Sequence, residues 1–262
     1  MSGLLARVLG RTAAAGDAPM APAAEYRRLW ADAKQRTYPA VDEYERACGA
    51  AIDAEWFHQL ALVTQVTIKR SELCYQHGRL LYATLARYVR ERGHEQLNIL
   101  ETGTARGFSS LCMARALEDA GATGKIVSFD VLPHDRPMFW NCLRDAEGPS
   151  TRGDLLSAYA GLVGRYLIFQ TGDTGQVLAS LFVPRVHFAF LDSVHTYEHV
   201  MAEFRAVHGC QLPGDIIFFD DYTPEAYPGV VKAADEICET AGYAAHVVAA
   251  SAQRRYLIAE KR

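Results

Sequence analysis

The sequence predicts a three-layer α/β sandwich, in which a mostly parallel seven-stranded sheet ends in an antiparallel hairpin and follows an N-terminal helical cap. From about residue 95 onward, short β-type runs alternate with helical stretches, which is typical of a parallel sheet. The runs at 186–191 and 216–219 are almost continuously apolar, as in strands covered on both faces. Near the C-terminus, AHVVAAS and RRYLIAE are separated only by Ala252 and Gln253, so they predict a hairpin at the sheet edge.

The remaining elements follow from local patterns. Residues 1–22 place Arg7 and Arg11 among Leu and Ala before an Ala/Gly/Pro-rich stretch, which predicts a disordered or loosely docked tail. Apolar residues at helical spacing predict a cap over residues 23–94. The parallel strands are expected at 98–100, 126–129, 167–169, 186–191 and 216–219.

Composition limits the class of partner. The chain has 27 Lys and Arg against 31 Asp and Glu, a formal charge of -4, and lacks the dense basic cluster of a nucleic-acid binder. Its apolar runs fall short of the roughly 20 residues that cross a bilayer. The six cysteines form no C-x-x-C pair, which favours reduced thiols and a cytoplasmic location. A small-molecule partner is therefore expected, and a homo-oligomer stays open.

A glycine-rich turn follows the first predicted strand. Gly103 and Gly107 lie between that strand and a helical stretch at 108–120, where backbone N–H groups can approach a ligand closely. Asp130 ends the next strand, at a position where a carboxylate can bind the two hydroxyls of a ribose. The alternative is that Asp130 only begins a turn toward Pro133.

Four features together resemble the class I S-adenosylmethionine-dependent methyltransferases. They are E-T-G-T-A-R-G at 101–107, the acidic end of the second strand, the Gly-Asp pair at 172–173 and the terminal hairpin, and the resemblance spans residues 95–262. It implies that the methionine and ribose parts of the cofactor contact Glu101, Gly103, Thr104, Gly107, Phe108 and Ser109, the ribose Asp130, and the adenine Asp173. For Asp173 the alternative is a helix N-cap.

Three carboxylates follow the fourth and fifth predicted strands. Asp192 lies in F-L-D-S-V-H-T-Y, and Asp220 and Asp221 lie in F-F-D-D-Y, so all three are expected at the carboxyl edge of the sheet. Without partners they would repel one another, and a hard divalent cation such as Mg²⁺ would relieve that cost. Because neighbouring residues of a strand point to opposite faces, joint ligation by Asp220 and Asp221 requires the chain to leave the sheet there.

These two strand ends are similar to the metal-dependent O-methyltransferases, particularly the macrocin-type sugar enzymes with an Asp-x-x-His-x-Tyr strand end. In catechol-type relatives a lysine base stands where this chain has His195, and an Asn stands where it has Asp221. The resemblance implies His195 and Asp192 as catalytic groups and Asp192, Asp220 and Asp221 as metal ligands. The alternative is a metal-free site, in which Asp192 binds cofactor or acceptor and Asp220 holds local backbone.

The sequence therefore predicts an S-adenosylmethionine-dependent methyltransferase of the EC 2.1.1 class, acting on a hydroxyl of a small molecule such as a sugar or natural product. One alternative, a nicotinamide-dependent oxidoreductase, is disfavoured by the G-x-x-x-G spacing and the terminal hairpin. Another, a non-catalytic S-adenosylmethionine-binding partner subunit, is disfavoured by the titratable groups at the strand ends. The segment Lys69–Arg79 is a candidate lid over the cofactor.

Overall fold

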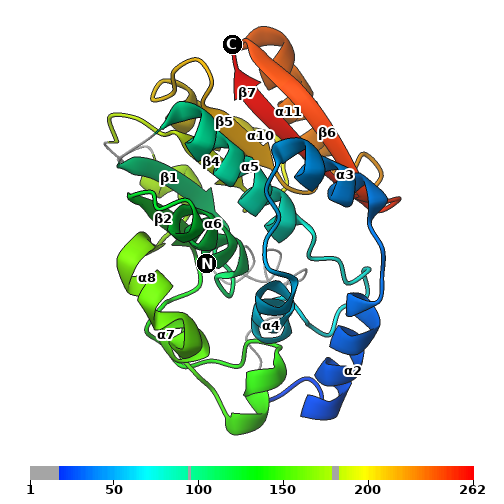
Figure 1. The fold of residues 1–262 in the computed structure, drawn as a ribbon. Coiled ribbons are helices and arrows are strands. Elements are labelled where there is room, and N and C mark those ends of the chain that lie inside the picture. The colour runs from blue at the N-terminus through cyan, green and yellow to red at the C-terminus, as the bar shows by residue number, and fades with distance from the viewer. Residues whose placement is uncertain (1–17, 94–95, 179–182) are drawn as a thin grey trace.

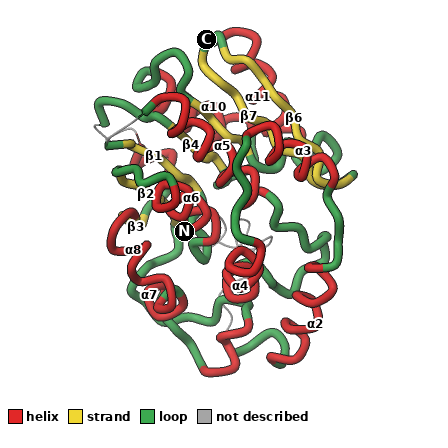
Figure 2. Tube along the Cα trace, viewed as in Figure 1, coloured by secondary structure: helices red, strands yellow, loops and turns green. Residues whose placement is uncertain are grey.

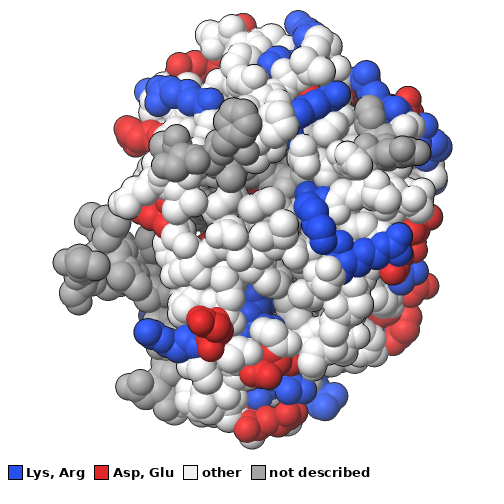
Figure 3. Space-filling model, turned by 90° about the vertical axis from the view of Figure 1, so that its left-hand side faces the viewer, with Lys and Arg blue, Asp and Glu red and all other residues white. Residues whose placement is uncertain are grey.

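The structure is a computed structural model that describes residues 18–93, 96–178 and 183–262. Most of the predicted N-terminal tail, residues 1–17, lies outside the described residues. Within the described ranges, none of the helices combines the length and apolar character that a membrane span requires. On the face shown in Figure 3, acidic and basic side chains form small, interspersed groups among uncharged ones.

A seven-stranded sheet forms the centre of the molecule (Figures 1 and 2). Its strands are β1 (Leu97–Thr102), β2 (Gly124–Asp130), β3 (Leu167–Thr171), β4 (Phe188–Leu191), β5 (Ile216–Phe219), β6 (Tyr243–Ser251) and β7 (Arg254–Lys261). The order is β3-β2-β1-β4-β5-β7-β6, and β7 runs antiparallel to both β5 and β6 while the other pairs are parallel. The predicted fold class is confirmed. The strand order reverses between β1 and β4, where α/β sheets commonly bind ligands.

Helices cover both faces of the sheet, so the molecule has three layers. The helices are α2 (Ala23–Lys34), α3 (Pro39–Cys48), α4 (Ala54–Thr64), α5 (His77–Arg92), α6 (Phe108–Asp119), α7 (Arg152–Leu155), α8 (Ala160–Tyr166), α9 (Thr174–Val177), α10 (Tyr197–His208) and α11 (Pro228–Thr240), with short 3₁₀ turns η1 (Leu143–Glu147) and η2 (Ser157–Tyr159). Helices α5, α6 and α8 pack on one face, and α10 and α11 pack on the other.

The central strands show why both faces are covered. In β4, Phe188 and Phe190 belong to the core under α5 and α6, whereas Ala189 and Leu191 belong to the core under α10 and α11. All four residues are buried. Side chains of a strand alternate between faces, so a continuous apolar run needs an apolar layer on each side.

Several predicted elements have different bounds in the structure. Strand β1 extends beyond the predicted 98–100 to include the polar Glu101 and Thr102, both fully buried, because each side chain finds hydrogen-bond partners inside the protein. The helix that follows Asp173 is α9, which ends at Val177, and residues 179–182 lie outside the described residues.

Asn141 joins the N-terminal helices to the segment that follows β2. Its Oδ1 accepts hydrogen bonds from the Tyr26 hydroxyl and the Ile68 backbone N–H, both at 3.0 Å, and its Nδ2 donates to the Ile68 carbonyl at 2.9 Å. The side chain is 2% exposed, and its φ of 52° lies in the left-handed region that Asn tolerates better than most residues. The side-chain amide of Asn141 therefore links α2 and the segment before α5 to the segment that follows β2.

We expect Asn141→Ala to lower the free energy of unfolding by about 2–4 kcal/mol, since three buried hydrogen bonds are lost together. Tyr26→Phe removes only one of them and should cost about 1 kcal/mol. Urea unfolding measures both. Equal losses for the two variants would contradict the central role of the amide.

Candidate active site

The ends of β1 and β4 touch through their backbones. The Asp192 N–H donates to the Thr102 carbonyl at 3.1 Å, with the Thr102 hydroxyl at 3.2 Å. Gly103 has a φ of 86°, and a Cβ placed there would lie 1.9 Å from the Asp192 carbonyl oxygen. From the sequence, Gly103 was predicted to let a ligand approach the backbone closely. The structure adds a second reason, since only glycine lets these two strand ends meet.

The glycine-rich turn continues through Ala105 and Gly107 into α6. Gly107 has a φ of 85°, and an added Cβ would lie 2.8 Å from Leu156. The Thr104 hydroxyl lies 2.5 Å from that of Ser128 on β2. Phe108 is 1% exposed and its ring lies among those of the core, so its side chain belongs to the packing under α5. The backbone of the turn is therefore the part placed to meet a cofactor.

Glu101, predicted to contact the cofactor, is fully buried in this structure. Its carboxylate accepts hydrogen bonds from the hydroxyls of Ser109, Ser110 and Ser128. Burial raises the pKa of Glu101, and the three hydrogen bonds oppose that rise. Glu101 and Ser109, which were both predicted to contact the cofactor, therefore contact each other. The hydrogen bonds of Glu101 join β1, β2 and the first turn of α6.

Asp130 ends β2 beside the glycine-rich turn, as predicted. Its Oδ2 accepts from the Ala105 N–H at 2.5 Å and its Oδ1 accepts from the Leu132 N–H at 2.8 Å. Burial raises its pKa, and the charge of Arg152 opposes the rise. Each carboxylate oxygen can accept more than one hydrogen bond, so both can still receive a ribose hydroxyl.

Asp173 is the N-cap of α9. Its Oδ1 accepts from the Gly175 N–H at 2.9 Å, which is the contact expected from the capping alternative. The second oxygen of the carboxylate is not used by that cap.

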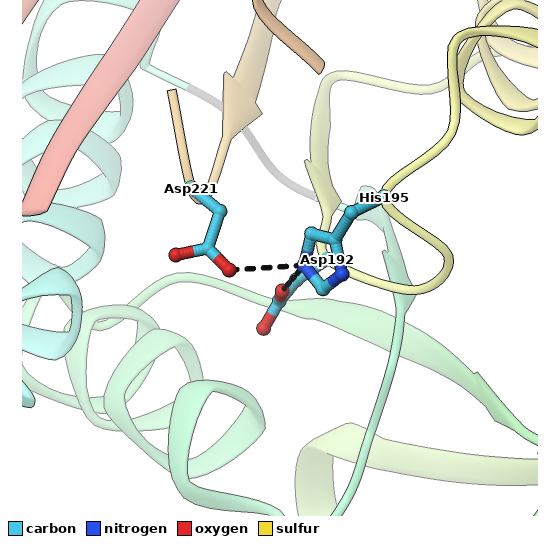
Figure 4. Close-up of side chains that lie close together, drawn as sticks. All are labelled: Asp192, His195 and Asp221. Atoms are coloured by element: carbon cyan, nitrogen blue, oxygen red, sulfur yellow. Dashed lines mark hydrogen bonds and ion pairs between the residues drawn. The ribbon is translucent and has the colours of Figure 1, made fainter. Parts of the chain in front are cut away.

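Asp192, His195 and Asp221 converge at the carboxyl ends of β4 and β5 (Figure 4). The His195 Nε2 lies 3.2 Å from Asp192 Oδ1 and 3.1 Å from Asp221 Oδ2. Asp221 has a φ of 54°, so the chain leaves the sheet at this residue. Asp220 lies beside the cluster, and its Oδ1 accepts from the Asp221 N–H at 2.7 Å. The structure thus brings together two of the three predicted metal ligands and the predicted base.

The carboxylates of the cluster have contrasting electrostatics. Burial, together with the charge of Asp220, raises the pKa of Asp192 to about 7. Burial and the charge of Asp221 raise the pKa of Asp220 to about 6. For Asp221, burial favours the neutral form, but the His195 hydrogen bond and the charge of Arg254 lower its pKa. Burial would lower the pKa of His195, yet its hydrogen bonds to Asp192 and Asp221 raise it to about 10.

Glu203 of α10 connects the strand ends, and it lies outside the predicted site. It is 1% exposed and accepts hydrogen bonds from the hydroxyls of Thr102 at 3.3 Å, Thr174 at 2.7 Å and Ser193 at 2.5 Å. These residues follow or end β1, β3 and β4. The sequence does mark Glu203, because it is a charged residue on the face of α10 that otherwise carries apolar residues such as Val200 and Phe204.

Two cations near the cluster also lay outside the predicted site. Arg254, the first residue of β7, forms a buried ion pair with Asp221. Lys69 comes from the predicted lid segment, and its pKa is lowered to about 8 by burial and by the charge of Arg254. No local pattern marks Arg254, since its partner is 33 residues away in the chain.

A family model described as a methyltransferase domain matches residues 100–222. That range contains every predicted site residue, from Glu101 to Asp221. Residues 100–222 are therefore similar to a methyltransferase domain. The predicted resemblance to class I methyltransferases is confirmed.

Solved structures share the fold of this chain at low sequence identity. Cofactor-bound Rv0187 from MTB is 19% identical, with a TM-score of 0.58 over 87% of this chain and 99% of the other. An O-methyltransferase from Bacillus cereus, in complex with SAH, is 17% identical, with a TM-score of 0.52 over 91% and 97%. TomG from Streptomyces achromogenes, an O-methyltransferase of tomaymycin synthesis in complex with SAM, is 16% identical, with a TM-score of 0.54 over 81% and 92%. Curated proteins gave no significant sequence match.

We expect Gly103→Ala to destabilise the protein and weaken cofactor binding. The left-handed backbone alone costs about 1–3 kcal/mol for a residue with a Cβ, and the contact with Asp192 adds to it. Gly121→Ala is the matched control, because Gly121 has a φ of 63° with open space around its Cα. Urea unfolding and calorimetry with S-adenosylmethionine measure both effects. Similar losses in the two variants would rule out the proposed contact.

Proposed function

We propose that this chain is an S-adenosylmethionine-dependent O-methyltransferase that acts on a hydroxyl of a small molecule such as a sugar or natural product. The observation that carries the proposal is the Asp192–His195–Asp221 cluster, which lies beside the glycine-rich turn in a methyltransferase domain. The six cysteines are all unpaired, which supports a cytoplasmic location. Calorimetry with S-adenosylmethionine, and with NAD as the control, tests the cofactor.

The chain offers the cofactor the backbone of the glycine-rich turn, in which Gly103 and Ala105 are only partly buried, and one carboxylate. In the proposed site the backbone of Gly103 to Gly107 faces the methionine part, and the free lone pairs of Asp130 accept the ribose hydroxyls. When bound, the cofactor supplies an activated methyl group on a sulfonium. The protein holds that methyl in line with the acceptor oxygen, and positioning of this kind accounts for much of the acceleration in group transfer.

The acceptor hydroxyl is expected beside His195. This side chain is 24% exposed, so one edge of the ring is accessible while Nε2 contacts the two carboxylates. It therefore can hold a hydroxyl at the rim, and it can deprotonate that hydroxyl when the ring is neutral. The helical cap lies upstream of the sheet and contributes Lys69 to the same region, where the charges of Arg254 and Asp221 act on it. We assign the cap to acceptor binding.

The residues present fit a divalent cation. Asp192, His195 and Asp221 each offer a ligand atom, all within 4.8 Å of one another, and Asp220 adds a buried carboxylate beside them. The raised pKa values of Asp192 and Asp220 reflect burial and repulsion between carboxylates, and a cation relieves both. When bound, a cation would lower the proton affinity of an acceptor hydroxyl. Three carboxylates would suit Mg²⁺, whereas a set including His195 suits a metal that accepts nitrogen.

We expect His195→Ala to lower kcat by about 10²–10⁴ while the affinity for S-adenosylmethionine stays near that of the wild type. This is the pattern of a group that acts in the transition state. His246→Ala, an exposed substitution on β6, is the control and should leave kcat unchanged. Loss of cofactor binding with kcat preserved at saturation would move His195 to the cofactor pocket.

We expect chelation to abolish methyl transfer and a divalent cation to restore it, because the clustered carboxylates are costly without one. Elemental analysis of Asp220→Asn and His195→Ala identifies the ligands. Metal lost only from Asp220→Asn indicates the three predicted carboxylates, and metal lost only from His195→Ala indicates the Asp192–His195–Asp221 set. Full turnover in chelator, without detectable metal, would refute the cation proposal.

A further inference from the structure

Arg152 is a fully buried cation outside the cluster described above. It belongs to α7, in the segment that connects β2 to β3, and its exposed fraction is 0%. Its guanidinium lies over two aromatic rings, at 5.4 Å from the centroid of Trp140 and 5.5 Å from that of Phe169. Burial lowers the pKa of Arg152 to about 10 against the opposing charge of Asp130. A buried charge of this kind is costly unless its contacts compensate.

Two of the three polar contacts of the Arg152 side chain are with residues of the proposed cofactor site. Its Nε donates to the Ala105 carbonyl at 2.8 Å, its Nη1 contacts His134 Nδ1, and its Nη2 lies 3.6 Å from Asp130 Oδ2. Among the described residues this Nη2 has no hydrogen-bond partner. The guanidinium thus attracts the Asp130 carboxylate without using one of its lone pairs.

Ala105 connects these contacts into a closed ring. It has a φ of 46°, in the left-handed region that a residue with a Cβ rarely adopts. Its N–H donates to Asp130 Oδ2 at 2.5 Å, and its carbonyl accepts from Arg152. The backbone N–H of Ala105 is therefore held by Asp130, the predicted ribose ligand, and its carbonyl is held by Arg152, which also attracts Asp130.

We propose that Arg152 is a positioning residue for cofactor binding, which holds Ala105 in its left-handed conformation and orients Asp130 toward the ribose. The inference rests on the proposed function, because it takes Asp130 as the ribose ligand. It gives the segment between β2 and β3 a role in the site, although that segment carries no catalytic group. Arg152 acts through Ala105 and Asp130, so its effect depends on Asp130.

A double-mutant cycle on the full chain tests this dependence. Arg152→Met and Asp130→Asn should each weaken S-adenosylhomocysteine binding by about 10- to 100-fold, the range for lost charged hydrogen bonds. The double variant should bind about as weakly as the weaker single variant, since both changes remove one arrangement. Arg152→Lys keeps the charge without the planar fork and should recover part of the affinity. At saturating cofactor, kcat of Arg152→Met should stay within about threefold of the wild type.

Arg165→Met is the matched control, because Arg165 lies on α8 of the same segment and is exposed. It should bind S-adenosylhomocysteine like the wild type. Effects of Arg152→Met and Asp130→Asn that multiply in the double variant would overturn the inference, as would unchanged affinity in a folded Arg152→Met protein. If Arg152→Met does not fold, the same cycle run with Arg152→Lys decides. Failure of the wild type to bind S-adenosylhomocysteine would overturn the proposed function itself, and the inference with it.

Discussion

The contact between Gly103 and the Asp192 carbonyl is the constraint on which the site depends. A Cβ at Gly103 would lie 1.9 Å from that oxygen, so the two strand ends can meet only because residue 103 is a glycine. The contact lies between β1 and β4, where the strand order reverses. It places the glycine-rich turn, which is proposed to bind the cofactor, beside Asp192 of the Asp192–His195–Asp221 cluster. The proposed binding and catalytic residues therefore share one edge of the sheet.

Carboxylates at this edge of the sheet fall into two kinds. Glu101 and Glu203 are each surrounded by hydroxyl donors, which satisfy their oxygens and hold neighbouring segments together. Asp192 and Asp220 instead face another carboxylate, and their pKa values rise to about 7 and about 6. A carboxylate saturated by donors contributes to structure, whereas one beside a like charge is prepared to gain a proton or a cation. Glu101 and Glu203 therefore hold the structure together, whereas Asp192 and Asp220 are the candidates for proton or cation binding.

The sequence predicted the features that depend on local pattern. Hydrophobic periodicity predicted the strands of the sheet, and the ends of the apolar runs placed Asp130, Asp192 and Asp221 at its carboxyl edge. Contacts between distant residues left no such signal: Arg152 meets Ala105 across 47 positions, and Arg254 meets Asp221 across 33. A lone charged residue usually lies on the surface, so composition and spacing favour that assignment until the fold shows its partner. The reason for Gly103 was likewise incomplete, because the strand it contacts lies about 90 residues away.

The state of His195 depends on what the neighbouring carboxylates bind. With its Nε2 between Asp192 and Asp221, the ring has a pKa of about 10 and is an imidazolium at neutral pH, a form that donates a proton but does not accept one. A divalent cation would compete for the same carboxylate oxygens and add positive charge beside the ring, and both effects would lower the pKa of His195. A neutral imidazole could then accept the proton of the acceptor hydroxyl. Cation binding and a basic His195 are thus linked by the same two carboxylates. His195 can act as a base only when another positive charge neutralises Asp192 and Asp221.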